Sequence, residues 1–201
     1  KRAGNRRREI LKVKKERCPW AKGEKDIHYH DTEWGIPSHD DSYIFEMLIL
    51  EGFQAGLSWN TILQKRENFR KAFDNFDYKK IAKYDEKKFE ELLENEGIIR
   101  NKLKVYSSKT NAISFMEVQK EFGSFAKYIW NFVDNRQIVN KWKNLSEVPA
   151  SSELSDKISK DLKKRGFKFV GTTIVYAFLQ AIGVIDDHLV NCPYKQNSNL
   201  G

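Results

Sequence analysis

Two cysteine–histidine pairs stand near opposite ends of the 201-residue chain. Cys18 is followed by His30 after eleven intervening residues, and His188 is followed by Cys192 after three. A histidine and a cysteine four positions apart can share one helix face or turn, and thiolate with imidazole suits tetrahedral zinc. Four protein ligands would close the coordination sphere, so the pattern favours a structural clasp between the chain ends. A terminal disulfide, two unrelated buried thiols and core histidines are the alternatives that spacing alone leaves open.

A glutamate continues an apolar stripe in the first third of the chain. The stripe consists of Ile44, Met47 and Leu48, and Glu51 follows at helical spacing. A carboxylate there is costly unless a partner meets it, so Glu51 is a candidate functional residue. The alternative is a glutamate at the margin of the stripe, facing water. Large aromatic residues lie around the same segment, namely Tyr29, Trp34 and Trp59. Aromatic residues are most often core, but a flipped nucleobase needs both an aromatic face and a polar group for its edge.

A basic segment lies between two predicted helices near the C-terminal end. Residues 160–168 hold five basic residues against one acid and lead through Gly166 and Gly171 into a further helix. Two helices joined by a short glycine turn can direct backbone N–H groups at a phosphate, with the positive end of the second helix behind them. The alternative is an ordinary corner between helices with a solvated basic face.

Helices are needed to position these residues, and the apolar spacing predicts them along most of the chain. Prolines occur only at 19, 37, 149 and 193, so the segment 38–148 leaves room for long helices. The helical pattern covers residues 44–55, 62–73, 79–93, 103–116, 125–133, 154–166 and 172–182. Because no segment shows sustained alternation of apolar and polar residues, the predicted fold class is all-α.

Composition and charge restrict the class of protein. Apolar residues make up 40% and charged residues 32%, which is typical of a soluble globular chain of one domain, or of one core with a second helical lobe. No run approaches 18 apolar residues, and no apolar stretch follows the basic N-terminal segment, so neither a transmembrane helix nor a secretory signal is expected. Two cysteines do not make a disulfide framework, so the cytoplasm is expected. Residues 1–15 hold eight basic residues and one acid, and they account for most of the net charge of +8. Such a segment either binds phosphates non-specifically or solubilises the chain.

Several blocks of the sequence, in order, resemble type I 3-methyladenine DNA glycosylase. The blocks are RCPW at 17–20, YHDTEWG at 29–35, LEGFQAGLSW at 50–59, GIIR at 97–100, KKRGFKFVGTT at 163–173 and DHLVNC at 187–192. The resemblance runs from about residue 17 to 194. It implies one glycosylase domain over residues 17–195, built of two helical lobes with a helix–hairpin–helix element. An extension at 1–16, expected to be flexible, and a tail at 196–201 flank this domain.

The resemblance also assigns roles to particular residues. It implies one structural zinc held by Cys18, His30, His188 and Cys192. It implies recognition of the base by Glu51 and Tyr29, stacking on Trp59, and further aromatic positions at Trp20 and Trp34. The DNA contacts it implies are Leu57, Lys163, Lys164, Arg165, Gly166, Lys168 and Gly171. The expected partner is double-stranded DNA containing 3-methyladenine, and the expected state is a monomer.

The implied reaction is hydrolysis of the N-glycosidic bond after base flipping, which leaves an abasic site. Methylation at N3 makes the adenine cationic and a good leaving group, so Glu51 is favoured as a reader of the base edge over a general base. No lysine nucleophile stands at 171–174, so a monofunctional enzyme is expected. The competing hypothesis is a catalytically inactive, zinc-stapled helical DNA-binding module.

Two positions depart from the family pattern or have an open role. Phe53 stands where relatives are often polar, and it is expected to alter a DNA-facing contact. Asp186 occupies the place of the catalytic aspartate of the wider helix–hairpin–helix superfamily. Type I relatives generally do not rely on that aspartate, and support of the zinc ligand His188 is the alternative role.

Overall fold

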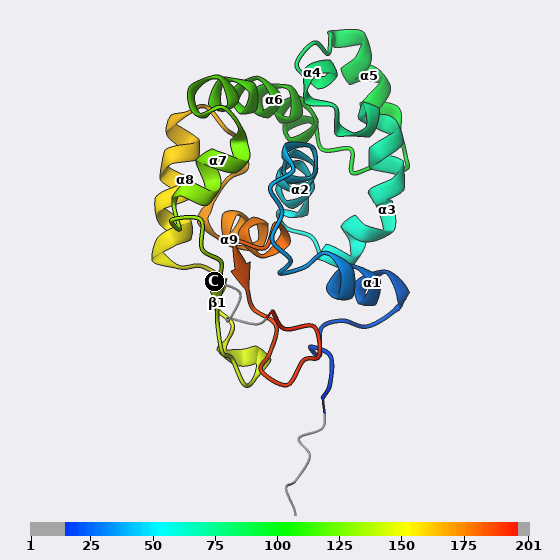
Figure 1. The fold of residues 1–201 in the computed structure, drawn as a ribbon. Coiled ribbons are helices and arrows are strands. Elements are labelled where there is room, and N and C mark those ends of the chain that lie inside the picture. Colours follow the sequence, from blue (N-terminus) through cyan, green and yellow to red (C-terminus); the bar gives the residue numbers. More distant parts are fainter. Residues whose placement is uncertain (1–14, 197–201) are drawn as a thin grey trace, which may run out of the picture.

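The computed structural model describes residues 15–196, and this part of the chain is mainly helical (Figure 1). Most of the basic segment 1–15 and the tail 197–201 lie outside the described residues. The α-helices are α1 (Glu24–Thr32), α2 (Asp41–Gln54), α3 (Trp59–Ala72), α4 (Tyr78–Ile81), α5 (Glu86–Glu94), α6 (Lys102–Phe122), α7 (Phe125–Asn131), α8 (Glu153–Lys164) and α9 (Thr172–Ala181). The shorter elements are η1 (Asp74–Phe76), η2 (Leu145–Glu147), β1 (Ile138–Val139) and β2 (Ile185–Asp186).

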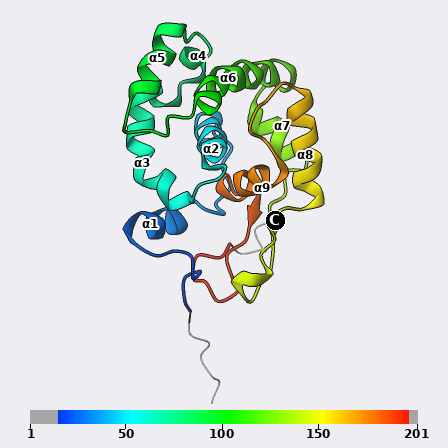
Figure 2. The same cartoon turned by 180° about the vertical axis from the view of Figure 1, so that it is seen from behind.

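Helix α2 is the central element of the fold. It lies between α3 on one side and α7 on the other, with α6 across one end and α9 beside it, and the view from behind shows the same arrangement (Figures 1 and 2). All residues from 44 to 53 are buried, including Glu46 and Glu51. A helix that is buried all round is normally apolar, so these two carboxylates need a structural or functional reason.

Polar side chains fix where the helices next to the aromatic residues begin. The Asp40 side chain accepts a hydrogen bond from the backbone N–H of Ser42 at the start of α2. The Ser58 side chain accepts one from Thr61 at the start of α3. Such caps satisfy backbone donors that the first turn leaves unpaired. Helix α3 therefore begins at Trp59.

Segments from the two ends of the described chain lie side by side below α9 (Figure 1). Strand β1 pairs in parallel with β2, with Ile138 opposite Ile185. The backbone N–H of Val190 donates to the carbonyl of Trp142, and that of Glu16 donates to Asn191. The bond between Glu16 and Asn191 joins the two segments that carry the cysteines.

The structure differs from the sequence-based prediction in two places. The predicted helix 79–93 is two helices, α4 and α5, because the Asp85 side chain caps a new helix start at the Lys88 N–H. Helix α1 was not predicted, since only Tyr29 and His30 of its nine residues are buried and an apolar stripe is missing. The segment 188–192, expected on a helix face or in a turn, lies outside any helix and contains a turn at 190–191.

Candidate functional site

A cavity of about 360 Å³ lies where α1, α2, α3 and α9 meet. It is lined by Trp20, Tyr29, Trp34, Glu51, Gln54, Trp59, Leu145, Val148, Pro149, Ala177 and Gln180. All five residues predicted for the pocket are therefore together in one place, although they come from separate segments. The volume is within the range of about 300–1,000 Å³ that small-molecule sites occupy.

Glu51 is the acidic residue of this pocket. Its side chain is buried, and burial alone raises the pKa of Glu51 to about 8. Two buried side-chain polar atoms have no hydrogen-bond partner among residues 15–196, namely Glu51 Oε2 and Trp59 Nε1. Both belong to pocket residues. Because an unpaired buried polar atom costs about 1–3 kcal/mol, their presence in one cavity points to a ligand that supplies the partners.

The aromatic rings form one continuous wall of the pocket. The rings of Tyr29 and Trp59 are 5.2 Å apart between centroids, and Trp20 packs edge-on against Trp34 at 4.9 Å. Trp20 also lies 6.3 Å from Tyr29, which joins the two pairs. Burial, together with the nearby Glu51 charge, raises the pKa of Tyr29 well above its usual value. The Tyr29 hydroxyl therefore stays protonated.

A buried ionic network holds the helices that carry the pocket residues. The Arg66 guanidinium donates to both carboxylate oxygens of Glu33, each at 2.8 Å, and to Glu46 at 3.2 and 3.3 Å. Arg70 adds a 2.6 Å bond from its Nε to Glu46. Arg66 thus ties α2 and the segment after α1 to α3. This network also explains why Glu46 can be buried in α2.

Three soft ligands gather beside the pocket wall. The ligand atoms of Cys18, His30 and Cys192 all lie within 4.8 Å of one another, and all three residues are buried. His30 Nε2 is 3.5 Å from Cys192 Sγ. Both cysteines are free thiols, so the disulfide alternative is not observed. Hydrogen bonds from Cys18 and His30 lower the pKa of Cys192 below its usual value. This group could hold a metal ion.

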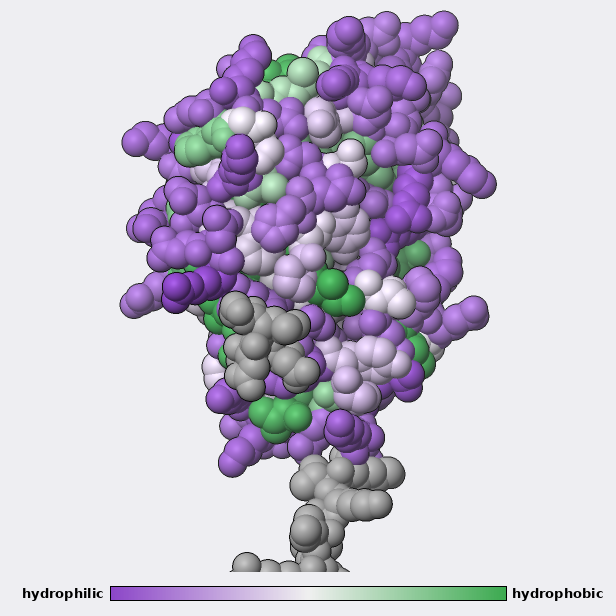
Figure 3. Space-filling model, in the orientation of Figure 1, coloured by the Kyte–Doolittle hydropathy of each residue, from purple (hydrophilic) through white to green (hydrophobic). Residues whose placement is uncertain are grey.

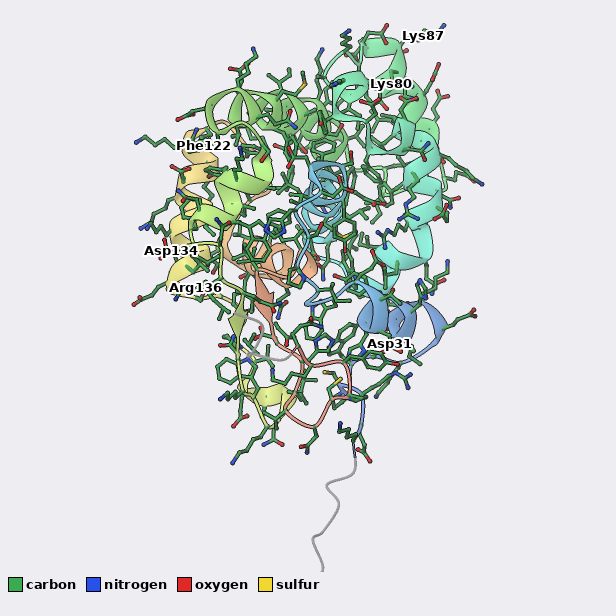
Figure 4. All side chains as sticks on the ribbon, in the orientation of Figure 1. Asp31, Lys80, Lys87, Phe122, Asp134 and Arg136 are labelled. Atoms are coloured by element: carbon green, nitrogen blue, oxygen red, sulfur yellow. The ribbon has the colours of Figure 1, made fainter. Side chains whose placement is uncertain are left out.

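His188 lies next to this group of three. Its ring packs edge-on against His30 with the centroids 4.7 Å apart, and its Nε2 is 3.3 Å from the His30 carbonyl oxygen. Carboxylates hold the other nitrogen of each imidazole: Asp186 Oδ1 lies 2.6 Å from His188 Nδ1, and Asp31 Oδ1 lies 2.7 Å from His30 Nδ1. Asp31, labelled in Figure 4, also accepts from Arg17 at 3.0 Å. Such carboxylates orient histidines that bind metals.

Asp186 and Gly35 show how tightly this region is built. Asp186 is fully buried and also accepts from the backbone N–H of Gln196, and it does not line the pocket. Its contacts are those of a residue that supports His188. Gly35 has φ +73°, and a Cβ there would lie 2.8 Å from Asp186 Oδ1. Only glycine fits this position without displacing the carboxylate.

The residues expected to contact DNA differ in their availability. Leu57 is 42% exposed in the loop between α2 and α3, and Lys163, Lys164, Gly166 and Lys168 are exposed at or after the end of α8. Gly171 precedes α9, whose first turn has no side-chain cap. Arg165, in contrast, is half-buried and pairs with Asp161 at 2.8 Å and Glu121 at 2.6 Å.

Phe53 corrects one expectation. Its side chain is 2% exposed and packs against Phe69 and Phe73, with the ring centroids 4.8 and 5.8 Å apart. It is a core residue and has no DNA-facing surface. The absence of a polar residue there is explained by the aromatic cluster that surrounds it.

Six lining residues were not identified from the sequence. Gln54 lies one turn after Glu51 on α2, so its helical spacing was an available signal. Ala177 and Gln180 lie one turn apart on α9, and Gln180 Nε2 donates to the buried Asp187 at 2.8 Å. Leu145 begins the single-turn η2, and Val148 and Pro149 follow it outside any element, so no periodic pattern exists to place them.

Comparison with known proteins places this geometry in a family. The model of the methyladenine glycosylase family matches residues 20–196, and the chain belongs to this family. DNA-3-methyladenine glycosylase of Haemophilus influenzae is 47% identical over 181 residues, which are 89% of this chain and 97% of that protein.

Solved structures agree with this result. A crystal structure of 3-methyladenine DNA glycosylase I has a TM-score of 0.86 and 46% identity, covering 89% of this chain and 98% of that one. A variant of 3-methyladenine DNA glycosylase I in complex with 3-methyladenine has a TM-score of 0.86 and 33% identity, covering 89% of this chain and 96% of that one. No helix among the described residues has the length and apolar character needed to cross a bilayer.

Proposed function

We propose that this protein is a monofunctional DNA glycosylase that removes 3-methyladenine from alkylated double-stranded DNA and leaves an abasic site. One observation carries the proposal: the orphaned Oε2 of Glu51 lies in a cavity walled by aromatic rings. A flipped base offers such a pocket a π-face to stack on and N–H donors at its edge. Family membership and the similarity to a structure holding 3-methyladenine support the same substrate.

Glu51 reads the base edge in this mechanism. The Glu51 carboxyl is neutral in the free protein at pH 7, because burial raises its pKa to about 8. A cationic 3-methyladenine beside it favours the carboxylate, so charge pairing forms only with the alkylated base. Adenine without the methyl group carries no charge and gains no such pairing. Trp59 supplies the stacking face, and the Tyr29 hydroxyl donates a hydrogen bond to the base.

Departure of the base and addition of water at the sugar complete the reaction. The positive charge on the methylated base weakens the N-glycosidic bond, and the bonding electrons leave with the base. Water then adds at the sugar carbon and loses a proton. The pocket stabilises the extruded base through Glu51 and Trp59, so it contributes most to binding and to selection.

We infer that Cys18, His30, His188 and Cys192 hold one zinc ion. Two thiols and two imidazoles are the donor set of structural zinc, and burial of the thiols and the carboxylates on both Nδ1 atoms support the inference. The ion would supply no chemistry to the reaction. It would join segments that are 174 positions apart in the sequence, from residue 18 to residue 192.

The turn after α8 is proposed to hold the DNA backbone. Exposed Lys163, Lys164 and Lys168 surround a turn that leads into the uncapped first turn of α9, where backbone N–H groups suit a phosphate. We propose that this is a helix–hairpin–helix element and that Leu57 contacts the duplex near the flipped base. The proposed unit is one cytoplasmic, monomeric domain spanning 17–195.

Release of free 3-methyladenine from methylated duplex DNA tests the function directly. We expect the free base to appear in step with abasic sites, without strand cleavage by a lysine. An inactive DNA-binding module would bind the duplex and release no base. A covalent enzyme–DNA adduct trapped by borohydride would contradict a monofunctional enzyme.

A further inference from the structure

Helix α6 carries polar residues on its buried side. Lys104, Ser107, Ser108 and Asn111 are all buried within this helix. The two serines bond back to carbonyls of the helix itself, Ser107 to Lys104 and Ser108 to Val105. Lys104 and Asn111 instead bind the backbone of two separate segments elsewhere in the chain. A buried amine and a buried amide serve no role in the proposed chemistry, so their contacts need another explanation.

Lys104 binds the end of α2. Its Nζ donates to the carbonyl of Phe53 at 3.0 Å and to that of Ala55 at 2.6 Å. The last carbonyls of a helix lack intrahelical partners and carry partial negative charge, and α2 has no basic residue of its own in its last turn. Lys104 therefore fixes the path of the chain between Gln54, which lines the pocket, and the exposed Leu57.

Asn111 binds the turn between α8 and α9. Its Oδ1 accepts from the backbone N–H of Lys168 at 2.8 Å, and its Nδ2 donates to the carbonyl of the same residue at 3.1 Å. The next residue, Phe169, has φ +55°, a conformation that bulky side chains rarely adopt. The two bonds from Asn111 hold the backbone immediately before this strained residue.

The two anchoring residues share one face of α6. They are seven positions apart, so they lie two turns and about 10.5 Å from each other along the axis. Helix α6 contains neither glycine nor proline between 102 and 122, so it is uninterrupted. The turn also touches α2 directly, because a Cβ at Gly52 would lie 3.4 Å from the Cβ of Phe169. A single rigid helix thus sets the separation between the two segments.

We propose that α6 positions the two DNA-contacting segments relative to each other, with Lys104 and Asn111 as positioning residues. Lys104 orders the loop 55–58 with its Leu57, and Asn111 orders the turn 165–171 with its Lys168. One duplex can then engage both segments without rearrangement of either, which lowers the cost of binding and flipping. The inference rests on the proposed function, because it takes both segments as DNA contacts.

The test uses three assays that need different parts of the molecule: binding of the free base, excision from methylated duplex, and binding to undamaged duplex. Binding of free 3-methyladenine, followed by tryptophan fluorescence, uses only the pocket. Single-turnover excision from methylated duplex also needs the loop 55–58. For Lys104→Met we expect excision to fall about tenfold, the effect of losing a charge-assisted hydrogen bond, while free-base binding changes less than about twofold. Asn111→Ala is expected to weaken binding to undamaged duplex about tenfold, while excision at saturating enzyme keeps the wild-type rate.

Lys109 offers a matched control on the same helix. Its Nζ donates to the carbonyl of Tyr84 at 2.8 Å, so Lys109→Met removes a comparable lysine–carbonyl bond away from both segments. We expect this variant to match the wild type in all three assays. If Lys104→Met does not fold, Lys104→Gln, which keeps an N–H donor on a shorter side chain, replaces it with the same expected divergence.

Several outcomes would overturn the proposal. The first is that the Lys104 variant loses excision and free-base binding equally. The second is that a folded Lys104 variant excises at the wild-type rate. The third is that the Lys109 variant is as impaired as the Lys104 and Asn111 variants. A wild-type protein that releases no base would instead refute the proposed function. The positioning role of Asn111 would still be decided by binding to undamaged duplex, where unchanged affinity contradicts it.

Discussion

Glu51 shows how one residue can be unfavourable for the fold and central to the proposed site. Ten consecutive residues of α2 are buried, and among them Glu46 is neutralised by arginines while Glu51 has no such partner. The protein therefore tolerates an uncompensated carboxyl at a position of α2 that faces the aromatic cavity. The burial and the location of this group lead to two separate predictions.

The first prediction concerns excision. Glu51→Gln keeps the size and one acceptor but removes the charge that pairs with a cationic base. Loss of a charge-assisted hydrogen bond is worth about 1.5–3 kcal/mol, so we expect excision of 3-methyladenine to fall about 10- to 150-fold. Affinity for undamaged duplex should not change. Single-turnover kinetics measure the effect, with Glu91→Gln on the exposed face of α5 as the matched control. Excision by Glu51→Gln at the wild-type rate would show that Glu51 is structural.

The second prediction concerns stability against pH. Burial raises the pKa of Glu51 from 4.5 to about 8, so the folded state holds a proton that the unfolded chain has lost between these values. Stability from this residue therefore declines as the pH rises through that window. We expect Glu51→Gln to be more stable than the wild type at pH 8, with the difference shrinking toward pH 5. Urea unfolding at both pH values measures it, and a difference that grows toward pH 5 would show the opposite sign.

At the scale of the elements, the basic residues of the turn between α8 and α9 differ in whether they are paired with carboxylates. Arg165 is engaged with two carboxylates and stacks on Phe122 and Tyr128, whereas Lys163 and Lys164 have exposed ends. The phosphate contacts proposed for the turn therefore rest on its lysines. Arg165 acts mainly to fix the end of α8 against α6 and α7.

A charge reversal separates these roles. Lys164→Glu should weaken binding to every DNA sequence alike and reduce the slope of affinity against salt by about one to two ions. Lys87→Glu on α5, which lies on the opposite side of the ribbon from α8 in Figure 1, provides the control and should leave binding unchanged. The measurement is a salt titration of duplex affinity. A change in lesion preference without a change in overall affinity would argue against phosphate binding.

The helices that the sequence predicts are those with a periodic apolar pattern. Helices α2, α3, α6, α7, α8 and α9 were predicted because an apolar face or a proline-free stretch marks each of them. Helix α1 was not predicted because its buried side chains are those of Tyr29 and His30, which do not form an apolar stripe. The break between α4 and α5 depends on the local cap at Asp85. Periodicity does not record either kind of interaction.

The candidate site was predictable to the extent that its chemistry resides in unusual residues. Glu51 on an apolar stripe and the two cysteine–histidine pairs stood out by type and spacing. The wall formed by Leu145, Val148 and Pro149 did not, because ordinary apolar residues in a loop acquire a role only from the tertiary fold. The burial of Phe53 likewise follows from the positions of Phe69 and Phe73 in space.

At the scale of the whole molecule, large apolar residues are seldom exposed in the described part of the chain. The side seen in Figure 3 is mainly hydrophilic, with hydrophobic residues in separate small patches. The exposed large apolar residues among residues 15–196 are likewise few and come from different elements: Leu57, Leu103, Ile113, Leu145 and Val190.

The clasp between the chain ends supplies a prediction at this scale. Cys192→Ser removes one proposed ligand, so we expect about one zinc per chain in the wild type and little in the variant, together with a lower melting temperature. Elemental analysis and thermal unfolding measure the two effects. The control is the wild type stripped by a chelator and reloaded with zinc, which should recover its stability. A metal-free wild type with unchanged stability would refute the clasp.

The clasp and the pocket share a wall. Trp34 stacks on His30 at 5.9 Å and meets His188 edge-on at 4.8 Å, and Trp20 meets His30 edge-on at 5.3 Å. Both tryptophans also line the cavity. A metal ion held by these imidazoles would therefore lie one ring contact away from the proposed base-binding surface. Thermodynamic coupling of this kind is reciprocal: the factor by which a bound metal changes the affinity for the base is the factor by which the base changes the affinity for the metal. If the proposed zinc tightens base binding, the base therefore tightens zinc binding by the same factor.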